Sequence, residues 1–146
     1  MIAYLDTSAL VKRYIRETGT DDVVALVEDA EAVGSVMLTQ VEIASALGKA
    51  ARVEWVEHSA ANKAWKDFLL HWPSFTRISV TPLLAERASQ LSWEYGLRAY
   101  DAVHLAATLI WQETLDTPIT LAAYTRELWM AGQNAGLNVW PENLYS

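Results

Sequence analysis

The chain has 146 residues, of which 52% are hydrophobic and 20% are charged, and it contains no cysteine. This length fits one domain, residues 1–146, and the apolar content excludes a disordered or collagen-like protein. Without cysteine, a disulfide scaffold, a thiolate metal site and a cysteine nucleophile are excluded as well.

The charge balance is acidic, with 11 Lys and Arg against 18 Asp and Glu and a formal net charge of −7. Proteins that bind duplex nucleic acid without specificity are usually basic, so this balance argues against that role. A nuclease is not excluded, because its site needs several carboxylates and metal ions can reverse the local field.

Neither a membrane span nor a secretion signal is evident. The most apolar stretch, residues 102–111, contains His104 and is too short to cross a bilayer. The N-terminus has no basic flank and carries Asp6 early, unlike a signal peptide. We therefore expect a cytoplasmic protein that does not bind membranes.

Short apolar runs alternate along the chain with longer segments of helical period. In chain order, the pattern predicts strand 2–5, helices 8–15 and 23–30, strand 36–38, helices 40–52 and 59–72, strand 77–80, helices 82–95 and 98–112, strand 118–122, helix 125–135 and strand 137–140. Thr39 is expected to cap its helix, with Glu42 as the capping-box partner. Strands that alternate with helices predict an α/β fold with a parallel sheet covered on both faces.

Three acidic residues fall where predicted strands end or the following helices begin. Asp6 directly follows the first strand, Glu42 lies in the first helical turn after the second, and Asp101 begins a helix. Each acid alone fits a helix cap or a first-turn position. Together they are expected at the carboxyl edge of the sheet, where functional crevices lie. Converging carboxylates repel one another unless a cation joins them, and oxygen ligands favour Mg²⁺ or Mn²⁺.

The segments around these acids resemble the PIN-domain ribonucleases, and among them the VapC-type toxins of toxin–antitoxin modules. The matching segments are residues 4–12 (YLDTSALVK), 39–47 (TQVEIASAL), 97–106 (LRAYDAVHLA), 125–128 and 135–137. The resemblance implies a three-layer α/β/α sandwich with a central parallel sheet, and a homodimer. It also implies Mg²⁺- or Mn²⁺-dependent cleavage of RNA and inhibition by an antitoxin that inserts a peptide near the active site.

By the same resemblance, Asp6, Glu42 and Asp101 are the catalytic, metal-binding acids, and Thr7 or Ser8 is the supporting hydroxyl. The chain departs from the family pattern at Thr125, where a fourth acid usually stands. A threonine hydroxyl brings no charge, although it can hold a metal-bound water.

Two nearby acids are not expected to replace the missing one. Asp116 precedes its strand and should lie at the opposite edge of the sheet, and Glu127 should point elsewhere. An alternative therefore stays open, in which the protein is a catalytically weakened module that binds RNA or an antitoxin without efficient cleavage. Another aspartate-dependent phosphotransfer fold is disfavoured, because no second Asp lies two residues after Asp6.

Weaker signals surround the acids. His104 follows Asp101 by three residues, and its ring is expected to pack and hydrogen-bond behind the site rather than bind metal. Tyr100 and Tyr124 adjoin the site and could stack on bases or simply pack. Four basic residues are candidates for RNA-phosphate contacts, for ion pairs with the acids or for plain solvated charges: Lys12, Lys49, Arg98 and Arg126.

A tryptophan-rich stripe on one predicted helix joins Ala61, Trp65, Phe68 and Trp72. Such a stripe is large for an exposed face of a small monomer. We expect it to lie partly in a homodimer interface.

Overall fold

The computed structural model describes residues 1–144 and contains a five-stranded sheet in which all pairings are parallel. The strands are β1 (Ile2–Leu5), β2 (Ala32–Val36), β3 (Thr76–Ile78), β4 (Ile119–Ala122) and β5 (Asn138–Trp140), in the order β3–β2–β1–β4–β5. The helices are α1 (Thr7–Leu10), α2 (Thr20–Asp29), α3 (Leu38–Arg52), α4 (His58–His71), α5 (Pro82–Tyr95), α6 (Ala99–Leu115) and α7 (Arg126–Asn134), with short 3₁₀ helices η1 (Val11–Arg13) and η2 (Trp72–Ser74).

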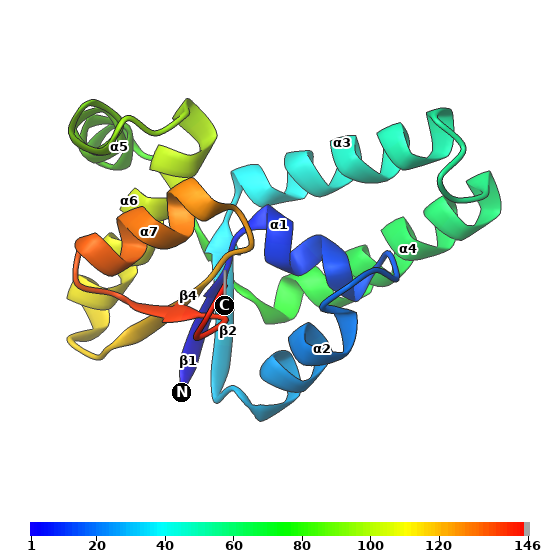
Figure 1. Ribbon diagram of the computed structural model, residues 1–146, viewed down its shortest axis with the longest axis horizontal. Coiled ribbons are helices and arrows are strands. Elements are labelled where there is room, and N and C mark those ends of the chain that lie inside the picture. Colours follow the sequence, from blue (N-terminus) through cyan, green and yellow to red (C-terminus); the bar gives the residue numbers. More distant parts are fainter. Residues whose placement is uncertain (145–146) are drawn as a thin grey trace.

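Helices cover the sheet on both faces, which confirms the predicted three-layer α/β/α sandwich. In Figure 1, α1–α4 lie on one side of the sheet and α5–α7 on the other. Parallel neighbours need crossover connections, and these helices provide them. No helix within residues 1–144 is long and apolar enough to span a membrane.

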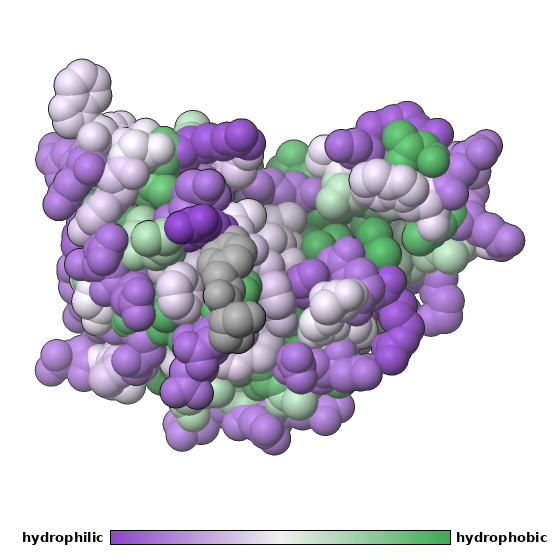
Figure 2. Space-filling view, in the orientation of Figure 1, coloured by the Kyte–Doolittle hydropathy of each residue, from purple (hydrophilic) through white to green (hydrophobic). Residues whose placement is uncertain are grey.

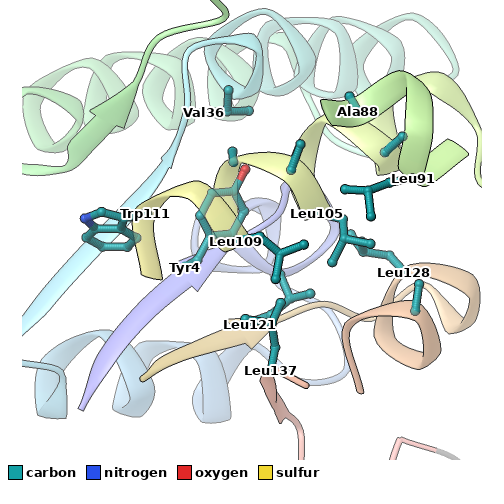
Figure 3. Close-up of a cluster of buried hydrophobic side chains, with 14 of the residues drawn as sticks. Tyr4, Val36, Ala88, Leu91, Leu105, Leu109, Trp111, Leu121, Leu128 and Leu137 are labelled. Carbon is teal, nitrogen blue, oxygen red and sulfur yellow. The ribbon is translucent and has the colours of Figure 1, made fainter. Parts of the chain in front are cut away.

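A buried apolar cluster lies between the sheet and α5–α7 (Figure 3). Leu105 on α6 and Leu121 on β4 are fully buried in it. Gly34 on β2 makes room for this packing, because a Cβ atom there would lie 2.7 Å from the Trp111 ring. A second buried cluster, which includes Ile43 and Phe68, joins the opposite face of the sheet to α1–α4.

Several predicted boundaries are confirmed. Thr81 caps α5 by accepting a hydrogen bond from the Leu84 backbone amide at 3.1 Å. Gly96 ends the same helix in the left-handed conformation, at φ 66°. Asp116 follows α6 and precedes β4, so it lies at the amino edge of the sheet as expected.

The prediction for the second strand and its helix cap was wrong. The strand is Ala32–Val36 because Ile2 pairs with Ala32, which sets the register earlier in the chain. Thr39 therefore lies inside α3, and its hydroxyl is hydrogen-bonded to the Ser35 hydroxyl at 2.6 Å instead of capping the helix. Because the N-cap is Met37 rather than Thr39, Glu42 lies two residues deeper in α3, in its second turn.

The tryptophan-rich stripe, which was expected to lie partly in a homodimer interface, packs mostly within the protomer. Ala61, Phe68 and Trp72 are buried within the protomer, and Trp65 stacks on Phe68 with ring centres 5.4 Å apart. The stripe faces the neighbouring α3 rather than solvent, because α3 and α4 form an antiparallel pair. Its burial therefore gives no support for a dimer interface at this place.

Candidate active site

The predicted site lies where the strand order changes direction, at the carboxyl ends of the adjacent strands β1 and β4. Successive connections place β2 and β3 on one side of β1, and β4 and β5 on the other. Such a switch point leaves a crevice beyond the strand ends. Asp6 follows β1 directly, and its backbone amide donates to the carbonyl of Ala122 at the end of β4.

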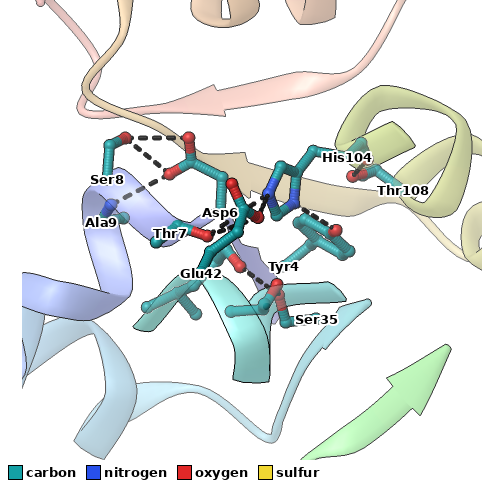
Figure 4. Close-up of polar contacts among 11 residues, drawn as sticks. Tyr4, Asp6, Thr7, Ser8, Ala9, Ser35, Glu42, His104 and Thr108 are labelled. Carbon is teal, nitrogen blue, oxygen red and sulfur yellow. Dashed lines mark hydrogen bonds and ion pairs between the residues drawn. The ribbon is translucent and has the colours of Figure 1, made fainter. Parts of the chain in front are cut away.

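Asp6 is held firmly at this edge and is only 2% exposed. It is the N-cap of α1, and its carboxylate accepts from the Ala9 amide at 2.9 Å and from the Ser8 hydroxyl at 2.7 and 2.8 Å (Figure 4). Burial raises the pKa of Asp6 to about 6, and the nearby Asp101 carboxylate adds to this rise. These hydrogen bonds and the adjacent His104 offset part of that effect.

Asp101, in the first turn of α6, is the second buried carboxylate of the site and is 7% exposed. Burial raises its pKa, His104 opposes the rise, and the charges of Glu42 and Glu127 increase it. The structure therefore brings Asp6 and Asp101 close enough to affect each other. Neither of them forms an ion pair with a lysine or arginine in the described part of the chain.

Glu42 belongs to a hydrogen-bonded group that runs into the core. Its Oε1 accepts from the Thr7 hydroxyl at 2.8 Å and lies 2.8 Å from Nε2 of His104. His104 is 1% exposed, and its Nδ1 lies 2.7 Å from the Tyr4 hydroxyl. The expectation that His104 packs and hydrogen-bonds behind the acids is confirmed.

Tyr4 is a site residue that the sequence analysis missed. It is fully buried, and burial raises the pKa of its hydroxyl well above the ordinary value. A signal was present, because side chains two residues apart on an extended strand point to the same face. Tyr4 thus shares the face of Asp6, and its buried hydroxyl contacts the acids through His104.

Thr125 lies after β4 as the N-cap of α7, with a buried side-chain oxygen that has no hydrogen-bond partner within residues 1–144. A buried hydroxyl without a partner costs about 1–3 kcal/mol, a cost that an ordered water removes. Thr125 follows β4, whose last residue Ala122 accepts a hydrogen bond from the Asp6 amide, and hydroxyl and carboxylate oxygens are ligands suited to a hydrated Mg²⁺ or Mn²⁺ ion.

The acids are not arranged as a complete metal site by themselves. In the part of the chain that the structure describes, no three His, Asp or Glu side chains converge as a group that could hold an ion. The bonds from Thr7 and His104 hold one Glu42 oxygen away from such a set. An ion at this edge would therefore meet Asp6 and Asp101 first, and Glu42 through water or after a side-chain shift.

The predicted phosphate-binding residues differ in their surroundings. Lys12 donates to the Glu17 carboxylate at 3.1 Å and lies 4.4 Å from the centre of the Tyr124 ring. Lys49 is exposed on α3, with its Nζ 5.8 Å from the centre of the Trp55 ring. Lys12 is thus engaged within the protein, whereas Lys49 points to solvent beside an aromatic ring.

The two arginines lie where helices begin at the carboxyl edge. Arg98 is the exposed N-cap of α6 and donates to the Tyr100 hydroxyl at 2.9 Å. Arg126 is exposed in the first turn of α7, with its Nε 3.5 Å from the Met130 sulfur. Both arginines therefore lie at the same edge of the sheet as Asp101. Burial raises the pKa of Asp101, and the charge of Arg98 lowers it.

Comparisons with known proteins agree with this fold. The model of the PIN domain matches residues 3–111, which is most of the chain. Ribonuclease VapC45 of Mycobacterium tuberculosis is 32% identical over 98% of this chain and 97% of its own length. The chain belongs to the PIN-domain family, among the VapC-type ribonucleases.

Solved structures share the PIN fold at lower identity. PAE2754 from Pyrobaculum aerophilum matches with a TM-score of 0.66 and 24% identity, over 99% of this chain and 87% of that one. A toxin–antitoxin complex from Klebsiella pneumoniae matches with a TM-score of 0.55 and 19% identity, over 81% and 83%. The segment matched by the PIN-domain model contains Asp6, Glu42 and Asp101, and Thr125 lies beyond it.

Proposed function

We propose that this VapC-type protein is an endoribonuclease toxin that requires Mg²⁺ or Mn²⁺. The observation that carries the proposal is the pair of nearly buried carboxylates, Asp6 and Asp101, at the carboxyl edge of the sheet. Two buried acids without basic partners are costly unless a cation compensates them. The relative VapC45 is named as a ribonuclease, which supports the same class of reaction here.

The ion would be held by Asp6 and Asp101, with Glu42 as a third contact, direct or through water. When bound, a divalent ion supplies Lewis acidity at the phosphate and activates water for attack. Ser8 and the Ala9 amide hold the Asp6 oxygens in place, so little rotamer entropy is lost when they bind. The low exposure of both carboxylates strengthens their electrostatic interactions.

Positive side chains around the acids would hold the RNA on either side of the cleaved bond. Arg98 and Arg126 lie at the same edge of the sheet as Asp101, and Lys49 lies further along α3 from Glu42. We propose that these three contact phosphates, with Lys12 as a fourth contact once it leaves Glu17. Phosphate contacts of this kind position a strand without reading its sequence.

The direct test is cleavage of a mixed RNA substrate by the purified protein, with Mg²⁺, with Mn²⁺ and with excess chelator. We expect products only when a divalent ion is present. Undiminished cleavage in chelator would rule out the metal mechanism. Cleavage that also persists after Asp101→Asn would show that the nuclease activity comes from a contaminant or another site.

The alternative function is a weakened module that binds RNA or an antitoxin without efficient cleavage. The observation in its favour is Thr125, a neutral side chain where the family pattern has a fourth acid. RNA binding with no cleavage in Mg²⁺ or Mn²⁺ would support this alternative over the enzyme.

We propose an antitoxin as the protein partner and the cytoplasm as the site of action. A chain in a toxin–antitoxin complex shares this fold, and buried carboxylates offer a target for a basic side chain. An antitoxin arginine that reaches Asp6 and Asp101 would compete with the metal. Adding Mg²⁺ should then weaken inhibition by the purified antitoxin, and unchanged inhibition would contradict this mode.

We propose a single domain that dimerises through α5 rather than through the buried stripe on α4. On α5, Trp93 is 93% exposed and Leu83 is 70% exposed, so this helix offers apolar side chains that a second copy could cover. Light scattering should give a dimer mass at micromolar concentration, and Trp93→Glu should shift it to a monomer. A monomer mass for the unchanged protein would contradict the dimer.

A further inference from the structure

His104 connects the hydrophobic core to one acid of the site. Its ring is 1% exposed, with Nε2 2.8 Å from Oε1 of Glu42 and Nδ1 2.7 Å from the hydroxyl of Tyr4 (Figure 4). The rings of Tyr4 and His104 meet edge to face, with centres 5.8 Å apart. Both ring nitrogens are therefore used, and the ring has no room to turn.

The partner of Nε2 decides the direction of that hydrogen bond. A carboxylate oxygen only accepts hydrogen bonds, so Nε2 of His104 donates to Glu42. The Tyr4 hydroxyl at Nδ1 can donate to a neutral ring or accept from a protonated one. In either form of the ring, Nε2 donates to Glu42.

Both hydrogen bonds to Glu42 end on the same oxygen. Thr7 donates to Oε1 at 2.8 Å, and Nε2 of His104 donates to Oε1 as well. Within residues 1–144, Oε2 receives no hydrogen bond, and the side chain is 22% exposed. Two donors on one oxygen fix the carboxylate plane and leave the second oxygen for another ligand.

We propose that His104 is a positioning residue, which holds Oε1 of Glu42 so that Oε2 is the oxygen offered to the ion or its water shell. The part of this inference that concerns the ion rests on the proposed function, whereas the orientation of Glu42 does not. Outer hydrogen-bond partners of this kind typically change metal affinity by about 10–100-fold.

Two substitutions of His104 separate positioning from simple packing. In His104→Gln, the longer side chain can place an amide N–H near the position of Nε2 and keep the bond to Glu42. In His104→Asn, the shorter side chain reaches only the position of Nδ1, so the Tyr4 partner is kept and the donor to Glu42 is lost. Both variants remove the ring, which makes them matched controls for packing.

The experiment combines crystal structures of the two metal-free variants with calorimetric titration of Mn²⁺ into RNA-free protein. We expect Glu42 to keep its orientation in the Gln variant and to swing away in the Asn variant. We expect Mn²⁺ affinity to fall about tenfold more in the Asn variant than in the Gln variant, with similar losses in Tm. An unmoved Glu42 in the Asn variant, or equal Mn²⁺ affinities, would overturn the inference.

Two further outcomes keep this inference separate from the proposed function. If the unchanged protein binds no Mn²⁺, the metal mechanism fails, while the crystal structures still decide the orientation of Glu42. If both His104 variants fail to fold, Tyr4→Phe takes their place. It should leave His104 without a partner at Nδ1, alter the ring ¹⁵N spectrum and weaken Mn²⁺ binding, and an unchanged spectrum and affinity would overturn the inference.

Discussion

The apolar cluster under α5–α7 and the polar group at the carboxyl edge meet at one residue, Tyr4 (Figures 3 and 4). The ring of Tyr4 is fully buried in the cluster, and its hydroxyl contacts His104 at the edge. In the apolar cluster, burial of apolar surface stabilises the fold at about 25 cal/mol per Å². At the carboxyl edge of the sheet, buried carboxylates reduce the stability of the fold until a cation compensates them. A single side chain, Tyr4, thus contacts both the region that stabilises the fold and the region that holds the acids.

The surface shows a related contrast. Figure 2 shows hydrophobic residues gathered in a hollow on one side, amid a largely polar face. A groove of about 360 Å³ between η1 and α3 is lined mainly by apolar residues such as Ile15, Ala50 and Trp55. The acids lie at the other end of α3, near Glu42. The apolar groove and the acids therefore lie toward opposite ends of α3.

The largest expected effect comes from removing a carboxylate at the edge. Asp101→Asn should lower RNA cleavage more than about 100-fold, above the loss that outer hydrogen-bond partners cause. The fold should remain, and the Tm of the metal-free protein should not fall, because repulsion with Asp6 is relieved. Cleavage rates and thermal melts in chelator measure both effects.

The matched control for this prediction is Asp116→Asn at the opposite edge of the sheet. Asp116 ends α6 in the left-handed conformation, at φ 49°, which asparagine also tolerates. Cleavage by this variant should equal that of the unchanged protein. A similar loss in both variants would mean that the effect is not specific to the site.

The second prediction concerns the apolar cluster. Leu121→Ala removes a fully buried side chain from β4 and should lower the free energy of unfolding by about 3 kcal/mol. Cleavage per folded molecule should change little, because Leu121 pairs with Tyr4 through the backbone of the sheet and its apolar side chain makes no hydrogen bond to the acids. Urea unfolding measures the stability, and RNA cleavage at urea concentrations below the unfolding transition measures the activity of the folded protein. A large loss of activity in the folded protein would show that the apolar cluster and the polar group are not independent.

The third prediction is a pH dependence with a defined sign. Burial raises the pKa of Asp6 from 3.8 to about 6, so between these values the folded protein binds a proton more tightly than the unfolded chain. The stability of the metal-free protein should therefore fall as pH rises from about 4 to about 6, by up to about 3 kcal/mol from Asp6. Asp6→Asn should lack this contribution.

Urea unfolding of both proteins in chelator, at pH 4, 5, 6 and 7, measures this difference. The free energy of unfolding of the Asn variant should rise relative to that of the unchanged protein as pH rises. This difference should level off above about pH 6. A difference between the two proteins that does not vary with pH would contradict the raised pKa of Asp6.

The smallest expected effect is at Thr125. Thr125→Asp adds a carboxylate where an unpartnered hydroxyl now lies, and it should tighten Mn²⁺ binding about tenfold and raise the cleavage rate. It should also lower the Tm of the metal-free protein, because a further acid joins Asp6 and Asp101. Calorimetry on Thr125→Asp and on the uncharged Thr125→Asn isolates the effect of the added charge on Mn²⁺ affinity. Equal affinities of the two variants would show that residue 125 does not face the ion.

The sequence alone determined the layer architecture, the order of elements and the edge at which Asp6 and Asp101 meet. These features depend on local signals, such as apolar runs, caps like Thr81 and the glycine that ends α5, together with general rules for parallel sheets. The roles assigned to the acids remain predictions, because they concern ion and RNA contacts rather than the fold.

Only the tertiary structure decided the register of β2, the burial of the stripe on α4 and the contacts of Glu42. Strand pairing sets the register of β2, so that Thr39 lies inside α3 and its hydroxyl is hydrogen-bonded to that of Ser35. Phe68 on α4 is buried against residues of the neighbouring α3. Tyr4 and His104 are 100 residues apart in the chain, so no local pattern predicts their hydrogen bond. Local signals act within a few residues, whereas packing joins side chains that the sequence keeps apart.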